Sequence, residues 1–146
     1  MKKRSVRLKV VLELAERKEQ AAMDVLQNKR RYLDQQQQQL QSLESYYQQY
    51  VDGVRRDMQG SLAIHTLQLS QGFMHQVGVA IEQQQGSVHI AQQEFDRALG
   101  VWKVAHQKRK GMFDLIERYR NEETIEAEKQ IQKLLESDFV ASRFRR

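Results

Sequence analysis

The chain has 146 residues with no proline and no cysteine, 29% of them are charged, and its formal net charge is +5. The missing cysteines exclude disulfides and thiol chemistry, and the missing prolines permit long uninterrupted helices. No stretch approaches the roughly 20 apolar residues of a transmembrane helix, and Arg7, Lys9 and Glu13 break the apolar run that a signal peptide needs. We therefore expect a cytoplasmic protein.

A mainly apolar heptad repeat begins near the N-terminus and predicts a helix over about residues 5–58. Its members step by four and three residues alternately from Leu8 to Val54. This spacing keeps one stripe of a helix turned toward a partner in a left-handed coiled coil. Within it, the run Gln35 through Gln39 predicts a polar helical segment in which Gln36 loosens the seam locally and helps to set the register.

Residues 59–65 predict a short loop, because Gly60 and Ser61 interrupt the pattern and Thr66 can cap a following helix. A second heptad repeat runs from Leu67 to Tyr119, within a predicted helix over about residues 66–137 that a basic tail, 138–146, follows. A loop this short makes the two helices antiparallel.

Antiparallel pairing can be tested on the residue numbers. If residue i faces residue 124−i, one seam falls on the other, and large residues meet small ones: Ala22 meets Trp102, and Leu33 meets Ala91. Such complementary sizes are what close packing requires. The sequence thus predicts an all-α, single-domain fold of two long helices in an antiparallel coiled-coil hairpin, with the second helix overhanging.

The overhang is predicted by a change of phase. From Tyr119 the seam positions advance by four, four and four residues, which relaxes the left-handed supercoil. Beyond this point the pairing of i with 124−i reaches the start of the chain, so the second helix has no residues of the first helix to pair with. Apolar residues of this segment still need cover, and basic residues surround the same end. We predict a partner site there, formed by Arg4, Arg7, Arg118, Arg120, Ile125, Ile131 and Leu134.

A second stripe widens the apolar face near the loop. It comprises Gln39, Leu43, Tyr46 and Tyr50 on the first helix, and Phe73, Val77, Ala80 and Gln84 on the second. Two facing helices can bury only one stripe each, so the surplus predicts an exposed protein-binding patch. The alternative is that Leu62, Ile64 and Leu67 fold back and cover it.

No constellation in the sequence predicts catalysis, a cofactor or a metal site. His65, His75, His89 and His106 share no i,i+3 or i,i+4 pair, and the scattered glycines form no phosphate-binding loop. Basic clusters are spread along the chain and interleaved with acids, so nucleic acid is not an expected partner. We expect no enzyme; a nucleic-acid-binding or structural coiled coil remains the alternative class.

Short motifs resemble FliJ proteins of the bacterial flagellar export apparatus over roughly residues 5–120. They are Leu43-Glu44-Ser45-Tyr46-Tyr47-Gln48-Gln49-Tyr50 before Asp57-Met58, then Phe73, Ala80-Ile81-Glu82-Gln83, Ala98-Leu99 and Trp102-Lys103. The resemblance implies a cytoplasmic stalk, similar to the central-stalk subunit of rotary ATPases, that works peripherally at the inner-membrane export apparatus. Its implied partners are the hexameric export ATPase, the membrane export-gate protein and export chaperones.

The resemblance also implies roles for particular residues. The family's gate-binding cluster matches the eight residues of the second stripe, with departures at Val77, where leucine is frequent, and Gln84, where histidine occurs. The end carrying both termini is the one that enters the ATPase ring in such proteins. The corresponding stalk of a virulence-type III secretion system is a further alternative that these residues do not separate.

Overall fold

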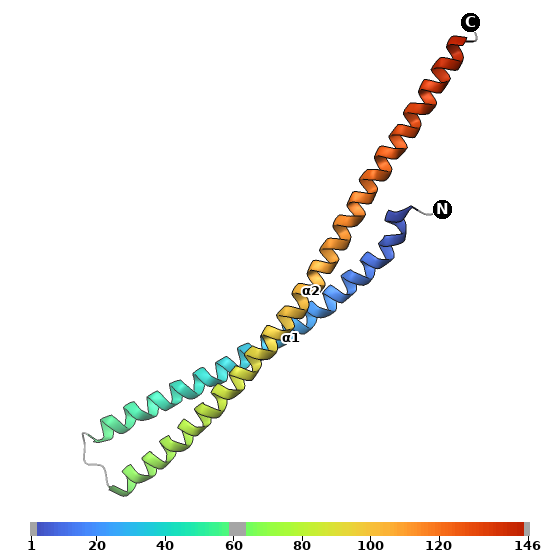
Figure 1. Cartoon of the computed structure of the whole chain (residues 1–146). Coiled ribbons are helices and arrows are strands. Elements are labelled where there is room, and N and C mark those ends of the chain that lie inside the picture. The colour runs from blue at the N-terminus through green and yellow to red at the C-terminus, as the bar shows by residue number, and fades with distance from the viewer. Residues whose placement is uncertain (1–2, 59–63, 145–146) are drawn as a thin grey trace. The chain divides into compact units, whose positions relative to one another are not determined.

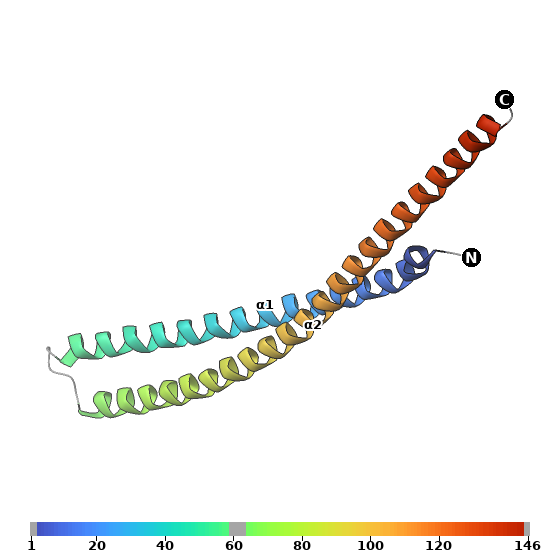
Figure 2. The ribbon, with the colours of Figure 1, turned by 45° about the horizontal axis from the view of Figure 1, so that its top comes forward.

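The structure is a computed structural model of the chain, and it describes residues 3–58 and 64–144. These residues form two helices, α1 (Arg4–Met58) and α2 (Ile64–Phe144), and the described ranges contain no strand (Figures 1 and 2). The expected all-α fold is confirmed. Most of the predicted loop, residues 59–63, lies outside the described residues.

Both ends of α2 differ from the sequence prediction. The helix begins at Ile64, so Thr66 lies inside its first turn rather than capping it. It then continues to Phe144, seven residues beyond the predicted end at 137 and through most of the predicted tail. Neither glycine nor proline occurs after Gly111, so nothing in this stretch stops a helix.

The chain divides into two compact units, and each contains a segment of both helices. The terminal unit comprises Met1–Ala22 with Trp102–Arg146, and the central unit comprises Met23–Val101. In the terminal unit, Ser5 bonds to Glu123 and Glu19 pairs with Arg109. In the central unit, Lys29 pairs with Glu94 and Tyr50 contacts Phe73. Partner numbers fall on α2 as they rise on α1, so the segments in each unit are antiparallel.

The predicted seams are the buried lines of both units. Every seam position from Leu8 to Val54 and from Leu67 to Tyr119 is buried or half-buried, whereas most positions between them are exposed. The deepest pair is the one expected from the size rule, because Leu33 is 2% exposed and Ala91 is 1% exposed. The cross-helix hydrogen bonds and ion pairs fall within four positions of the partner assigned by 124−i, which agrees with the predicted register.

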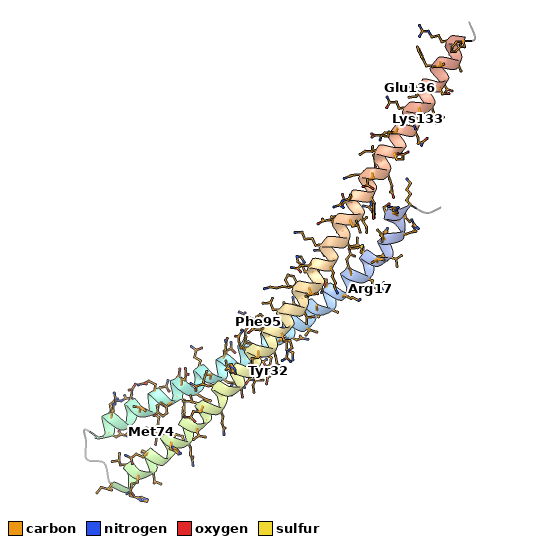
Figure 3. The ribbon with its side chains drawn as sticks, viewed as in Figure 1. Arg17, Tyr32, Met74, Phe95, Lys133 and Glu136 are labelled. Atoms are coloured by element: carbon orange, nitrogen blue, oxygen red, sulfur yellow. The ribbon has the colours of Figure 1, made fainter. Side chains whose placement is uncertain are left out.

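The terminal unit also contains the overhang, which we define as residues 124–144 of α2. From Thr124 to Phe144 every described side chain is exposed, and the first turn of α1 lies beside Glu123. Figure 3 shows Lys133 and Glu136 on the part of α2 that has no α1 segment beside it. The predicted overhang is therefore present as continuous helix.

Candidate partner-binding surfaces

A carboxylate from α2 caps the first turn of α1 in the terminal unit. The Ser5 hydroxyl donates to Glu123 Oε2 at 2.7 Å, and the Ser5 backbone N–H donates to Oε1 at 3.3 Å. The first turn of α1 has no acidic residue of its own, so Glu123 supplies the negative charge that a helix N-terminus favours. These bonds, led by the Ser5 hydroxyl, hold the pKa of Glu123 below its usual value.

A second polar cluster lies within the seam of the terminal unit. Arg109 donates to the Glu19 carboxylate, and His106 Nδ1 lies 3.5 Å from the other oxygen of that carboxylate. The Arg109 hydrogen bond is the main reason that the pKa of Glu19 is lowered. The His106 ring stacks on Trp102 with 4.9 Å between ring centroids, which closes the apolar side of the cluster.

The seven residues predicted at the ATPase end all lie in the terminal unit, in two kinds of surroundings. The Arg4 guanidinium lies over the Tyr119 ring at 5.5 Å, and Arg120 pairs with Glu117 at 3.6 Å. Ile125, Ile131 and Leu134 are more than half exposed on the overhang, and Leu134 is 65% exposed. A shallow hollow farther along is lined by Gln132, Leu135, Glu136, Phe139 and Val140. The apolar side chains of the overhang are uncovered.

In the central unit, the second stripe is built around three aromatic rings. Tyr50 and Phe73 meet at 4.8 Å between centroids, and Tyr46 meets the edge of Phe73 at 6.1 Å. Tyr46 stays 50% exposed, whereas Tyr50 and Phe73 are half-buried. Of the three residues that the alternative would place over the stripe, Ile64 is exposed, Leu67 is half-buried at its seam position, and Leu62 lies outside the described residues. The stripe is a supported aromatic surface with one outward-facing tyrosine.

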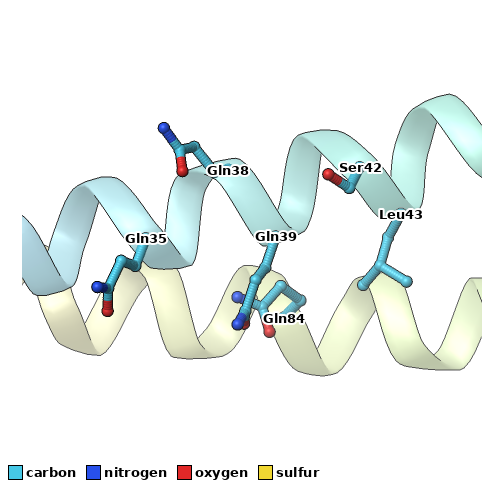
Figure 4. A pocket seen from close by; sticks show the side chains of 6 residues that line it. All are labelled: Gln35, Gln38, Gln39, Ser42, Leu43 and Gln84. Carbon is cyan, nitrogen blue, oxygen red and sulfur yellow. The ribbon is translucent and has the colours of Figure 1, made fainter.

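At the end of the second stripe that carries Gln39 and Gln84, one of the two glutamines is already hydrogen-bonded within the protein. Gln84 Nε2 donates to both the backbone oxygen and the side-chain oxygen of Gln36, each at 2.9 Å. Beside this pair is a shallow hollow lined by both Gln39 and Gln84, while the Gln38 side chain points away from α2 (Figure 4). Gln84 therefore acts as a seam residue, and Gln39 and Leu43 remain at the hollow.

Several of these residues were not predicted from the sequence. Nothing in the pattern singles out Glu123 as the cap of α1, because its partner is 118 positions away. The sequence pattern assigns His106 no partner, whereas in the structure it is half-buried and its ring lies beside the Glu19 carboxylate. A charged residue at a seam position, as at Glu19 and Arg109, is the one signal that could have prompted a search for cross-helix partners.

No group of three histidine, cysteine or acidic side chains in residues 3–58 and 64–144 is arranged to hold a metal ion. No helical segment in those ranges is long and apolar enough to cross a membrane.

The chain was compared with known proteins. Neither the curated proteins nor the solved structures gave a match. The family model described as the flagellar FliJ protein matches residues 3–146, nearly the whole chain. Together with the antiparallel two-helix fold, this match shows that the chain belongs to the flagellar FliJ protein family and is a flagellar export-associated protein.

Proposed function

We propose that the protein is a cytoplasmic stalk and adaptor of the flagellar export apparatus, and that the overhang engages the hexameric export ATPase. The observation that carries the proposal is the uncovered apolar surface of residues 124–144, where Ile131 and Leu134 are exposed although they would normally be buried. Basic residues at the same unit, Arg4 and Arg7, favour fast association with an acidic pore, and the apolar side chains prolong the complex.

Deletion of residues 126–146 tests this assignment. The deletion keeps Glu123 and therefore the cap of α1, and every side chain that the structure describes in the deleted range, residues 126–144, is exposed. The truncated protein should keep its helical circular dichroism per residue but lose most of its stimulation of the cognate ATPase. A matched control replaces only Lys129 and Lys133 by glutamine, which should leave stimulation nearly intact. Full stimulation by the truncated protein would place the ATPase contact elsewhere.

We further propose that the second stripe binds the export-gate protein, with Tyr46 as the exposed anchor. Aromatic residues dominate the buried centres of protein interfaces, and Phe73 and Tyr50 hold the Tyr46 ring in place. Tyr46→Ala should weaken gate binding about thirtyfold or more, since interface anchors contribute about 2 kcal/mol or more. The thermal unfolding midpoint should change little, because the ring is half exposed.

Tyr32→Ala is the matched control, because Tyr32 is similarly exposed in the central unit but lies outside the second stripe (Figure 3). Gate binding should survive this change. Equal losses from the two substitutions would show that the stripe has no special role. Export chaperones remain a proposed third class of partner on the strength of the family alone.

A further inference from the structure

Between residues 7 and 18 of α1 and residues 104 and 118 of α2, one flank of the terminal unit contains cationic and aliphatic side chains and no carboxylate; Glu122 is the next position of α2 on this flank. On α1 this flank follows heptad steps through Arg7, Val11, Leu14 and Lys18. On α2 it follows Val104, Lys108, Leu115 and Arg118, with Gly111, which has no side chain, at the position between Lys108 and Leu115. We call these eight residues the basic flank. Seven of them are exposed, and Leu115 is half-buried.

The two halves of the basic flank belong to one side of the paired helices. Val11 and Lys18 each directly precede a seam residue of α1, and Lys108 and Leu115 each directly precede a seam residue of α2. In an antiparallel pair, residues that precede the seam on the two helices line the same side. Arg4, which directly precedes the buried Ser5, reaches across the pair and lies over the Tyr119 ring of α2.

The other flank of the same unit has a different composition. It carries Glu13, Glu16 and Glu117 among its cations, and Glu117 pairs with Arg120. By contrast, Arg7, Lys18, Lys108 and Arg118 form no ion pair with any residue of the described ranges. The two flanks of the terminal unit therefore differ in charge, which the basic composition of the chain alone does not explain.

We propose that the basic flank lays the terminal unit on an anionic lipid surface. Valine and leucine side chains enter the headgroup boundary, while lysine and arginine stems lie along it and bring their charges to lipid phosphates. A protein-binding surface of this size would be expected to hold aromatic residues, as the second stripe does, and the basic flank has none. The proposal does not rest on ATPase or gate binding. Because Arg7 and Arg118 were also assigned to the ATPase end, lipid and ATPase would compete for them.

The test is sedimentation of the full-length protein with vesicles of phosphatidylcholine, with and without phosphatidylglycerol. Lys18→Gln with Lys108→Gln should weaken binding to the anionic vesicles roughly thirtyfold, which corresponds to about 1 kcal/mol for each basic residue near such a surface. The matched control, Lys103→Gln with Lys110→Gln, removes the same charge from outside the basic flank and should weaken binding only a few fold. Leu14→Ser should reduce the binding that persists at high salt.

Each outcome decides the proposal. The proposal is supported if the wild-type protein binds anionic but not neutral vesicles and if the Lys18 and Lys108 variant loses much more of that binding than the control variant does. Equal losses in the two double variants would mean that only net charge matters and would overturn it. A wild-type protein that ignores anionic vesicles would also overturn it, and lowered ATPase stimulation in the Lys18 and Lys108 variant would then identify the flank as a protein-binding surface. Circular dichroism melting of each variant confirms that these exposed substitutions leave the fold intact.

Discussion

Replacement of Leu33 by alanine measures how much the seam contributes to the stability of the central unit. Leu33 is 2% exposed, and the residue opposite it is Ala91, which is 1% exposed and offers only a methyl group to fill the space. The change removes three carbon groups at roughly 0.8 kcal/mol each, and the cavity left beside Ala91 adds to that loss. We expect the free energy of unfolding to fall by about 3 kcal/mol, or roughly 6–12 °C in melting temperature for a chain of this length.

The measurement is urea unfolding followed by circular dichroism, with Leu134→Ala as the control. The control makes the same chemical change on the overhang, where the side chain is 65% exposed and covers nothing. It should change the free energy of unfolding by no more than about 0.5 kcal/mol. If Leu33→Ala costs no more than Leu134→Ala, the seam is not what stabilises this unit and the packing argument fails.

Glu123→Gln should lower the melting temperature of the protein near neutral pH. Ser5 lowers the pKa of Glu123 in the folded state, so the ionised carboxylate stabilises the fold above about pH 4.3, the ordinary pKa of glutamate, and this stabilisation is lost on acidification. The melting temperatures of the wild-type protein and the variant should therefore converge at low pH. Cysteines at positions 22 and 102, replacing Ala22 and Trp102, should crosslink within one molecule, whereas exclusive crosslinking of 22 with 95 would show that the register is shifted by a heptad. Gly86→Ala should raise the free energy of unfolding by about 0.5–1 kcal/mol, since a Cβ there meets no atom within 4 Å; an unchanged urea midpoint would contradict this.

The fold could be predicted from the sequence because its stabilising interactions repeat with a period of seven. Each seam position is an independent observation that supports the same buried stripe, and no proline interrupts either predicted helix. The small residues Ala91 and Ala98 then fix which positions of the two helices meet, since they are buried opposite larger side chains. Helix ends were less predictable, as Ile64 and Phe144 show, because a terminus depends on single residues and not on a repeat.

The surfaces were predictable only in part, because contacts across helices are not periodic. The surplus of apolar residues located the second stripe, yet only the structure shows that Gln84 is engaged with Gln36 while Tyr46 faces outward. The cap at Ser5 depends on Glu123, 118 positions away, which no local pattern indicates. At Glu19 the charge at a seam position indicates that a cross-helix partner is needed, but it does not identify Arg109 as that partner.

The charged and amide residues in the seam favour one register of the two helices over the alternatives. A shift by one heptad would leave the apolar stripes in contact, but it would place the Glu19 carboxylate beside Trp102 or Ile116 instead of Arg109, leaving a charge without a partner. In the central unit, the same shift would separate Gln84 from Gln36. Each unit thus contains a polar pair that penalises the wrong register. A protein whose proposed binding stripe draws residues from both helices needs that register fixed, since a shifted pairing would separate the rings that form the stripe.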